Sequence, residues 1–315
     1  MSFRFETALV VGATGFIGSA LVRKLVDQNI TVLAPILTSR KQSKRLMQHK
    51  NILPIEVKDW DISQLRKKLK GCPAEIVFNV ASSGVPPQKR EITTLLDGSI
   101  NLLAVLIQAL EEDTKKFIIH TGSWLEYGLQ QRGSKINEDH PIEPTSLYGS
   151  AKAATHLIGS ALAKQRGFSF TTLRLFHVYG AGEASFRLMP TLINKLYSNK
   201  FVDLTIGNQI RDFIYIDDVV DSFIVAARMS KKQIRPAFNI CTGEPISIRN
   251  MAKKVADSLK KSHNLLHFGK IPTRPNEPSW GIGSNALFKN ITGWQPNTSL
   301  KKGIKNMLDV NIVNI

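Results

Sequence analysis

The sequence has little cysteine and no long apolar run. Its 315 residues include two cysteines, Cys72 and Cys241, which lie far apart and in no metal-ligand spacing. Two thiols are too few to staple a chain of this length, so we exclude a disulfide-rich secreted scaffold and expect no metal site. No apolar stretch reaches the roughly 18 residues of a membrane span, and the first residues do not form a signal peptide. We therefore expect a globular cytoplasmic protein without a membrane partner.

Acidic residues are scarce relative to basic ones. The chain has 25 Asp and Glu against 42 Lys and Arg, which gives a formal net charge of +17. Such a charge attracts anions of many kinds, including phosphorylated cofactors and nucleic acid. The basic residues occur in short scattered runs, however, and this is typical of a solvated surface. The charge alone does not select a nucleic acid as partner, and we do not expect one.

The chain alternates short apolar, β-branched runs with segments of helical period. This alternation predicts an α/β fold, with a doubly wound parallel sheet of the Rossmann type. Near-continuous apolarity indicates strands that helices cover on both faces. The runs that predict strands are Ala8 to Val11, Thr31 to Ala34, Ile76 to Val80, Phe117 to His120 and Phe170 to Leu175.

The pattern loosens after Tyr179, which suggests a second, smaller lobe. A further strand is predicted from Ala237 to Ile240, and a helix capped by Ser247 follows it. We expect a dinucleotide-binding domain over residues 1–180, rejoined by about 211–245. Residues 181–315 are then expected to form mainly a substrate-binding lobe.

A glycine-rich turn follows the first predicted strand directly. The sequence Gly-Ala-Thr-Gly-Phe-Ile-Gly, residues 12–18, opens the first predicted helix. Gly12 permits a tight turn, Gly15 lets a pyrophosphate approach the backbone, and Gly18 allows the helix to pack on the strand. A purely structural turn can show the same triplet, so the strand, turn and helix context carries the prediction of a dinucleotide site.

The end of the second predicted strand lacks an acidic residue. The stretch Leu33 to Lys44 contains no carboxylate, but it offers Ser39, Arg40 and Lys41. A carboxylate at this place binds the free ribose 2′-hydroxyl of NAD, whereas the 2′-phosphate of NADP needs cations. We therefore predict NADP(H), with NAD as the alternative. The three residues could equally belong to a loop without a ligand.

Tyr148 and Lys152 stand four residues apart, which on a helix places them on one face. A nearby ammonium stabilises a phenolate, so Tyr148 can give a proton to a carbonyl or take one from an alcohol. Ser123, just beyond the predicted strand from Phe117, can hydrogen-bond the same substrate oxygen. The pair alone is common on protein surfaces, and its place downstream of the glycine turn and the serine favours an active site.

Several motifs occur in the order seen in extended short-chain dehydrogenases/reductases of the NAD-dependent epimerase/dehydratase type. These are GATGFIG, a serine before a YG, YGSAK, RLFHVYGAG, IRDFIYIDDVV, and RPNE followed by TGWQP. The sequence resembles this family over nearly its whole length. The resemblance implies that Ser123, Tyr148 and Lys152 are catalytic, with Lys152 also holding the nicotinamide ribose. It further implies that Arg211 and Arg274 bind a nucleotide diphosphate, a role that suits guanidinium groups. Structural ion pairs are the alternative for both arginines.

The motifs and the resemblance together define two sets of expected site residues. At the substrate we expect Ser123, Trp124, Arg187, Arg211 and Arg274. His177 is placed beside the nicotinamide by the resemblance, although a lone histidine is more often a core residue. At the cofactor we expect Gly12, Thr14, Gly15, Phe16, Ile17, Gly18, Ser39, Arg40, Lys41, Asp59, Trp60, Ala81, Tyr148, Lys152 and His177.

Within the family, the sequence is most similar to nucleotide-sugar 4-ketoreductases such as the CDP-abequose and CDP-paratose synthases. The resemblance implies deoxysugar and lipopolysaccharide O-antigen biosynthesis. Leu95 replaces an Asn that is common in the helix beneath the active site. Sugar-nucleotide 4,6-dehydratases carry an Asp-Glu pair after the catalytic Ser or Thr, where this chain has Trp124 and Leu125. Without those carboxylates the acid/base pair for eliminating water is missing, which disfavours dehydration.

The preferred interpretation is therefore an NADP(H)-dependent reductase of a 4-keto nucleotide-linked deoxysugar. The alternative is a nucleotide-sugar epimerase that uses the same Ser-Tyr-Lys set in both directions. A non-catalytic regulator or RNA-binding relative is less favoured, because all three catalytic residues are present. The resemblance also implies a homodimer, in which the helix that carries Tyr148 and the one around Ser99 to Leu110 pack against their twofold copies. The stretch Ser99 to Leu110 is apolar over more of its circumference than one core face needs, and a fully buried helix would show the same pattern.

Overall fold

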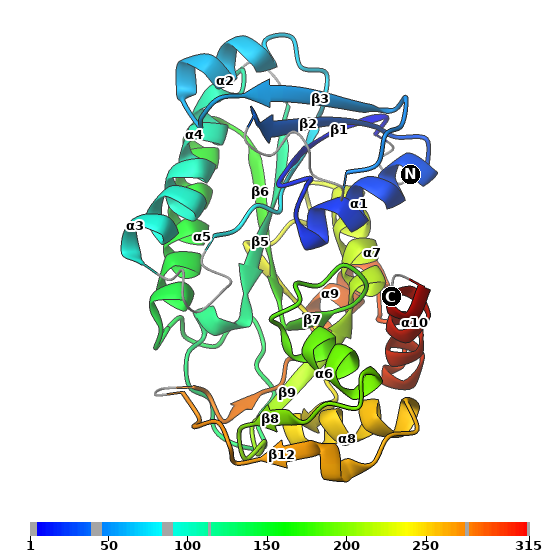
Figure 1. Cartoon of the computed structure of the whole chain (residues 1–315). Coiled ribbons are helices and arrows are strands. Elements are labelled where there is room, and N and C mark those ends of the chain that lie inside the picture. Colours follow the sequence, from blue (N-terminus) through cyan, green and yellow to red (C-terminus); the bar gives the residue numbers. More distant parts are fainter. Residues whose placement is uncertain (1–4, 39–45, 84–90, 113–114, 275–276, 314–315) are drawn as a thin grey trace.

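The computed structural model contains a seven-stranded parallel sheet, which occupies the upper part of Figure 1. The strand order is β10-β6-β5-β4-β1-β2-β3. Strands are added on one side of β1 as far as β3 and then on its other side from β4 onward, so the order reverses between β1 and β4. In open α/β sheets of this kind, ligands bind beyond the carboxyl ends of the strands at that point. The predicted α/β fold is confirmed. The strands are β1 (Thr7–Val11), β2 (Thr31–Leu37), β3 (Ile52–Val57), β4 (Ile76–Asn79), β5 (Phe117–Ser123), β6 (Ser169–Leu175) and β10 (Ala237–Ile240).

The structure describes all residues except 1–4, 39–45, 84–90, 113–114, 275–276 and 314–315. For residues 311–313 it describes the backbone but not the side chains. Strand β3 was not predicted from the sequence, because it contains Pro54, which cannot donate to a ladder. β3 comes last in the strand order, so one of its edges needs no partner and the proline is tolerated.

Helices cover both faces of the sheet, which explains why the central strands are mainly apolar and are buried along nearly their whole length. In Figure 1 one layer lies to the left of the sheet and the other to the right. The left layer contains α2 (Ile62–Leu69), α3 (Ile92–Leu95), α4 (Leu102–Ala109) and α5 (Leu147–Gln165), with a π-helical segment, Leu96–Asn101, between α3 and α4. The right layer contains α1 (Phe16–Asp27) and α7 (Ile216–Ala227).

A second sheet lies in the lower part of the molecule. β9 (Ile210–Tyr215) pairs in parallel with β7 (His177–Tyr179) and β13 (Trp280–Gly281), and antiparallel with β11 (Pro245–Ser247). A two-stranded sheet pairs β8 (Val202–Leu204) with β12 (Leu266–Phe268). The helices here are α6 (Leu188–Tyr197), α8 (Ile248–Ser258), α9 (Ala286–Thr292) and α10 (Leu300–Val313), with 3-10 turns at Trp124–Glu126 (η4) and His263–Leu265 (η5).

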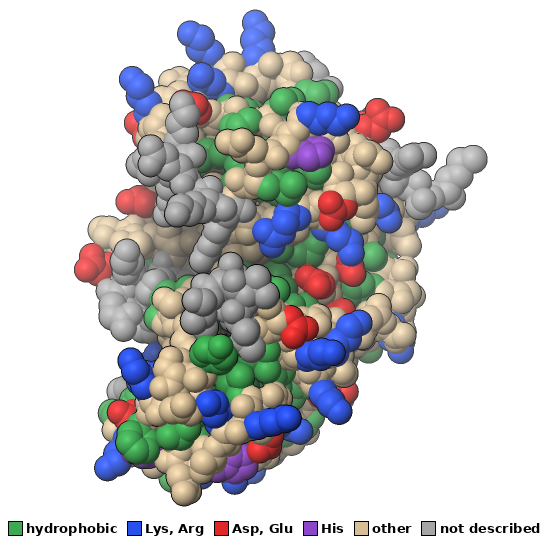
Figure 2. Space-filling model, turned by 45° about the vertical axis from the view of Figure 1, so that its right-hand side comes forward, with side chains coloured by type: hydrophobic (Ala, Val, Ile, Leu, Met, Phe, Trp, Pro, Cys, Tyr) green, Lys and Arg blue, Asp and Glu red, His purple; other side chains and the backbone are tan. Residues whose placement is uncertain are grey.

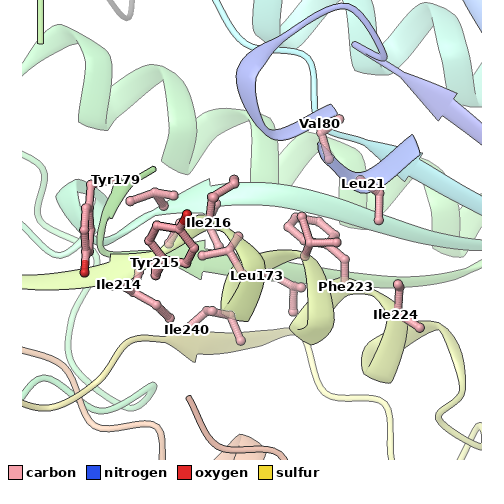
Figure 3. Packing of buried hydrophobic residues seen from close by; sticks show 14 of the residues in the cluster. Leu21, Val80, Leu173, Tyr179, Ile214, Tyr215, Ile216, Phe223, Ile224 and Ile240 are labelled. Atoms are coloured by element: carbon pink, nitrogen blue, oxygen red, sulfur yellow. The ribbon is translucent and has the colours of Figure 1, made fainter. Parts of the chain in front are cut away.

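One hydrophobic cluster runs through both parts of the molecule. Figure 3 shows members of this cluster from both parts, with Leu21 of α1, Leu173 of β6 and Phe223 of α7 at one end and Tyr179 of β7 and Ile214 of β9 at the other. Within the range 211–245, β10 joins the main sheet, whereas β9 belongs to the second sheet. Because the two sheets share a core, the division into a cofactor domain and a substrate lobe near residue 180 remains a proposal.

One helical stretch, Ile92–Ala109, is long and apolar enough by length and composition to cross a membrane, with a mean hydropathy of 1.5. This corrects the expectation that no such stretch occurs, because occasional polar residues such as Asp97 interrupt the apolar run without lowering its mean far. Leu103 and Leu106 on this stretch are buried in a cluster shared with α2 and α5. Leu95, at the position of the family's Asn, is also buried.

Charged side chains are spread widely on the surface that Figure 2 shows. Lys and Arg side chains are distributed over the whole of this face, with Asp and Glu among them. The charge of +17 is therefore not gathered in a single patch on this side. Among the residues that the structure describes, no group of three or more His, Cys, Asp and Glu side chains could hold a metal ion.

Candidate active site

The glycine turn joins the carboxyl end of β1 to α1. Gly12 has a φ of +91°, and a Cβ there would lie 2.6 Å from the backbone nitrogen of Ala81, just beyond β4. A Cβ on Gly18 would lie 2.0 Å from the carbonyl oxygen of Gly12. Side chains at Gly12 and Gly18 would therefore force the turn, the helix and the neighbouring strand apart.

The N-terminus of α1 fits the pyrophosphate of a dinucleotide. Gly15 is its N-cap and supplies no side chain, and the first turn carries no acidic residue. The first backbone N–H groups are therefore not capped by a side chain at Gly15, and they lie at the positive end of the helix dipole. Thr14, Phe16 and Ile17 are half-buried around this turn. The geometry agrees with the glycine motif predicted from the sequence.

Two other groups of expected cofactor residues are less informative. Ser39, Arg40 and Lys41 lie outside the described residues. Asp59 is exposed, and its Oδ1 accepts a hydrogen bond of 3.3 Å from Gln64 Nε2, while Trp60 packs partly buried against the cluster around α2. Both residues follow β3, at the edge of the sheet.

The Ser-Tyr-Lys residues come from neighbouring elements at the carboxyl end of the sheet. Ser123 is the last residue of β5, and Tyr148 and Lys152 lie one turn apart in the first two turns of α5. Lys152 is 1% exposed, and its Nζ donates a hydrogen bond of 2.8 Å to the carbonyl oxygen of Thr121. This bond holds the ammonium against the strand that ends at Ser123. Tyr148 is half-buried at the start of α5, where it can meet a ligand.

Ser123 is held by hydrogen bonds within its own turn. Its Oγ accepts a bond of 3.2 Å from the N–H of Leu125, and its own N–H donates at 2.7 Å to Oε1 of Glu126. The other carboxylate oxygen of Glu126 accepts a bond of 2.8 Å from Nε of Arg174, on β6. Glu126 and Arg174 were not among the predicted site residues.

Trp124, next to Ser123, forms part of an aromatic platform. Its ring stacks on Phe176 with the centroids 6.1 Å apart, and the guanidinium carbon of Arg211 lies 5.5 Å from its centroid. Arg211 is 3% exposed, and its Nη2 forms an ion pair of 2.9 Å with Glu277. Burial lowers the pKa of Arg211, although Glu277 opposes that shift. The structure thus brings Trp124 and Arg211 together, as expected for one substrate site.

Two arginines act electrostatically on His177. It is the first residue of β7, and its ring meets Phe213 edge-on at 5.0 Å. Burial lowers the pKa of His177 well below its usual range, and Arg187 and Arg211 add to this effect. His177 is therefore neutral at physiological pH, so it can donate or accept a hydrogen bond there without carrying charge.

Arg187 is paired with a carboxylate from the loop that follows β7. Its Nε lies 3.0 Å from Oε1 of Glu183, and burial raises the pKa of Glu183 to about 7. A Cβ on Gly182, in the same loop, would lie 3.8 Å from the ring of Phe16, so this loop lies beside the glycine turn. The loop that carries Glu183 and Arg187 therefore adjoins the glycine turn.

Arg274 differs from Arg211 in its exposure to solvent. It is exposed, and its backbone carbonyl accepts a bond of 3.3 Å from the N–H of Glu277. Glu277 also forms the ion pair with Arg211, so one residue contacts both expected phosphate-binding arginines, and the resident partner of Arg211 is this carboxylate. Charged residues in otherwise apolar segments were the available signal for Glu126 and Arg174, but no such signal marked Glu183 or Glu277.

Comparisons with known proteins find relatives that match nearly the whole chain. Among characterised relatives, the CDP-abequose synthase of Salmonella typhimurium is 26% identical over 313 residues, which cover 98% of this chain and 99% of the relative. The UDP-glucose 4-epimerase of Lactobacillus helveticus is also 26% identical, over 310 residues that cover 91% of each chain.

Solved structures share the fold over almost the whole chain. MoeE5 in complex with UDP-glucuronic acid and NAD has a TM-score of 0.85 at 24% identity, covering 98% of this chain and 100% of that chain. The UDP-glucose 4-epimerase of Thermotoga maritima with UDP-glucose has a TM-score of 0.84 at 25% identity, covering 98% and 99%. The model of one protein family matches residues 8–241, from the first strand through the glycine turn and the Ser-Tyr-Lys set to the end of β10. The chain therefore belongs to the NAD dependent epimerase/dehydratase family.

Proposed function

We propose that this enzyme reduces the 4-keto group of a nucleotide-linked deoxysugar with NADP(H). The observation that carries the proposal is the placement of Lys152, buried against the strand that ends at Ser123 and one helical turn from Tyr148. A buried ammonium beside a phenol and a hydroxyl suits a carbonyl that must gain a proton. The similarity to CDP-abequose synthase supports the reductase assignment.

The residues of the chain divide the work of the reduction. When bound, the dinucleotide supplies the hydride. Tyr148 donates a proton to the carbonyl oxygen, and the Lys152 ammonium stabilises the phenolate that is left. Because Ser123 Oγ already accepts the N–H of Leu125, its own O–H is available to donate to the same substrate oxygen. The glycine turn would hold the pyrophosphate, and Lys152 the nicotinamide ribose.

The substrate's nucleotide diphosphate is assigned to Arg211. This guanidinium is buried over the ring of Trp124, the residue that follows Ser123. Its partner Glu277 is a single, partly exposed carboxylate. A diphosphate offers more charge and more acceptor oxygens than Glu277 does, so it can compete for Arg211. Arg187 and His177 lie on the same side, where they can contact the sugar. Arg274 would have to turn inward to share the phosphates.

The coenzyme preference rests on the sequence alone. NADP(H) is supported by the absence of an acid from Leu33 to Lys44 and by Ser39, Arg40 and Lys41. NAD is the alternative, because the family is described as NAD dependent. Replacing Arg40 and Lys41 together by alanine should abolish a preference for NADPH. Steady-state kinetics with both coenzymes decides the matter, and equal use of NADH by the unmodified enzyme would exclude NADP(H) specificity.

Epimerisation is the second candidate, and the similarity to UDP-glucose 4-epimerases favours it. An epimerase oxidises and then re-reduces its substrate, so it keeps its coenzyme, whereas a reductase must exchange it. A turnover screen of 4-keto nucleotide sugars with NADPH and NADH tests the proposal. We expect stoichiometric coenzyme oxidation with at least one 4-keto sugar. Tightly retained NAD(H) together with interconversion of nucleotide hexoses would establish the epimerase instead.

A homodimer is also part of the proposal. Apolar side chains on the outer faces of α3 to α5 are well exposed, including Ile92 at 52%, Leu147 at 57% and Leu157 at 61%. A second copy of these helices would cover them. Light scattering at micromolar concentration should give twice the 35.1 kDa chain mass. A species of single-chain mass would exclude the dimer.

The two cysteines, unpaired in the structure, fit a reducing cytoplasm.

A further inference from the structure

The turn that carries Ser123 contains a buried carboxylate. Ser123 and Glu126 form a reciprocal pair, in which Glu126 Oε1 accepts the Ser123 N–H at 2.7 Å and Ser123 Oγ accepts the Leu125 N–H. Such capping boxes normally lie at exposed helix ends, but Glu126 is 0% exposed. A Cβ on Gly122 would lie 2.5 Å from Glu126 Oε1, so the glycine before Ser123 leaves space for the carboxylate.

The charge of Glu126 is matched from the neighbouring strand. Arg174 is 4% exposed, and its Nε donates to Glu126 Oε2 at 2.8 Å while its Nη1 donates to the Tyr127 hydroxyl, also at 2.8 Å. Tyr127 in turn donates to Asn239 Oδ1 at 2.8 Å. Burial alone would lower the pKa of Arg174, but Glu126 and Tyr127 outweigh burial and raise it. The turn is therefore anchored to β6 and β10.

A buried ion pair is a costly way to stabilise a fold, since an apolar pair of similar volume often serves as well or better. What the apolar pair cannot supply is an acceptor for the N–H of Ser123. That peptide sets the direction of Ser123 Oγ, and rotating it would break the bonds to both Glu126 and Leu125. The location of the charge therefore indicates a task at Ser123.

We propose that Glu126 is a positioning residue, which together with Arg174 fixes the peptide of Ser123 so that its hydroxyl meets the substrate carbonyl. The inference rests on the proposed function in so far as Ser123 acts on a carbonyl. Glu126 contacts neither substrate nor cofactor and acts only through Ser123.

The sharpest test shortens the carboxylate. Glu126→Asp keeps the charge opposite Arg174 but withdraws it from Ser123 by one methylene. Glu138→Asp is the matched control, because Glu138 accepts the N–H of Asn239 at 2.8 Å in the same network without touching Ser123. We expect kcat to fall roughly tenfold or more in Glu126→Asp, since small misplacements of a reacting group cost up to ~100-fold. KM and the Kd of NADPH should stay within about twofold, and Glu138→Asp should match the unmodified enzyme.

A second variant covers the case in which Glu126→Asp does not fold. The double variant Glu126→Met with Arg174→Met removes both charges, a replacement that buried pairs often tolerate, and it deletes the acceptor for Ser123. The same fall in kcat is expected. An unchanged kcat in either folded variant would overturn the proposal, as would an equal loss in Glu138→Asp.

A readout that needs no substrate separates this inference from the proposed function. Amide hydrogen exchange over residues 121–128 should become faster in Glu126→Asp and in the double variant, and not in Glu138→Asp, while α1 keeps its protection. If no nucleotide sugar is turned over by the unmodified enzyme, the proposed function fails and the exchange data still decide the inference. Unchanged protection at 121–128 would show that Glu126 does not fix the Ser123 peptide.

Discussion

Two buried arginines flank the turn after β5, and they differ in what surrounds them. Arg174 is 4% exposed and Arg211 is 3% exposed. Each guanidinium lies over an aromatic ring of that turn, Arg174 at 4.7 Å from the Tyr127 centroid and Arg211 at 5.5 Å from the Trp124 centroid. Arg174 is matched by buried partners and its pKa is raised, whereas burial lowers the pKa of Arg211. Similar burial therefore gives opposite electrostatic results.

The difference lies in the partner carboxylates. Glu126, the partner of Arg174, is 0% exposed, while Glu277, the partner of Arg211, is 26% exposed and sits on a loop. An anion from solution can replace a partly exposed carboxylate, but it cannot reach a fully buried one. Arg174 is therefore called the closed arginine and Arg211 the open arginine. The closed arginine holds structure in place, whereas the open one can exchange its carboxylate for a ligand anion, as the proposed function requires.

Removing the closed arginine should have the largest effect on stability. Arg174→Met leaves Glu126 buried without a cation, which typically costs about 3–5 kcal/mol of unfolding free energy. Arg211→Met leaves only a partly hydrated carboxylate and should cost about 1 kcal/mol or less. Urea unfolding of the two variants against the unmodified protein checks the contrast. Equal losses would mean that the two arginines have the same structural role.

The stability contributions of a histidine near Arg174 and of a carboxyl group near Arg187 should depend on pH with opposite sign. Near Arg174, burial and then the charge of Arg174 lower the pKa of His156 to about 4. The unfolding free energy should therefore fall as the pH drops from about 6.5 to 4. Beside Arg187, burial raises the pKa of Glu183 to about 7, although the charge of Arg187 opposes this shift. The unfolding free energy should therefore fall as the pH rises from about 4.5 to 7. Each shift corresponds to roughly 3 kcal/mol across its window.

Single variants separate the two limbs of that pH dependence. His156→Gln should flatten the acid limb only, and Glu183→Gln should remove the loss of stability toward neutral pH only. Unfolding free energies measured by urea titration between pH 4 and pH 8 give both slopes. A Glu183→Gln protein with the unmodified slope from pH 5 to pH 7 would show that Glu183 is not held in its neutral form.

The open arginine should matter most for substrate binding. Arg211→Ala should raise KM for the nucleotide sugar, corresponding to about 1.5–3 kcal/mol for a charge-assisted hydrogen bond. Arg274→Ala should raise KM less, because Arg274 is exposed and must first be ordered. Steady-state kinetics of both variants tests this order. An unchanged KM in both, with the fold intact, would place the phosphates elsewhere and weaken the nucleotide-sugar assignment.

Local patterns predicted most of the fold and the cofactor turn. The strand before Gly12 and the glycine spacing are contiguous in sequence, so the turn and the start of α1 could be derived without tertiary information. Ser247 was likewise predicted as the cap of α8, and its Oγ accepts the N–H of Asn250. β3 escaped prediction because Pro54 is acceptable only on an edge strand, and edge position depends on the strand order.

The closed network was partly visible in the sequence. Ser123 and Glu126 have the spacing of a capping box, and Arg174 is a charge within an apolar strand, which calls for a buried partner. The sequence could not show that Glu126 and Arg174, which are 48 positions apart, contact each other. The ion pair between Arg211 and Glu277 is also long-range, so an arginine expected to be free for phosphate proved to have a resident carboxylate.

The central claim is that Tyr148 protonates a sugar carbonyl during reduction by a nicotinamide coenzyme. The most direct measurement compares the unmodified enzyme with Tyr148→Phe in single turnovers of a nucleotide-linked 4-keto-6-deoxysugar, following loss of the reduced coenzyme. We expect Tyr148→Phe to bind the coenzyme with nearly unchanged Kd and to react about 10²–10⁴-fold more slowly, because only the proton donor is missing. Coenzyme oxidation by Tyr148→Phe at most of the unmodified rate would contradict the assignment of Tyr148 as the proton donor.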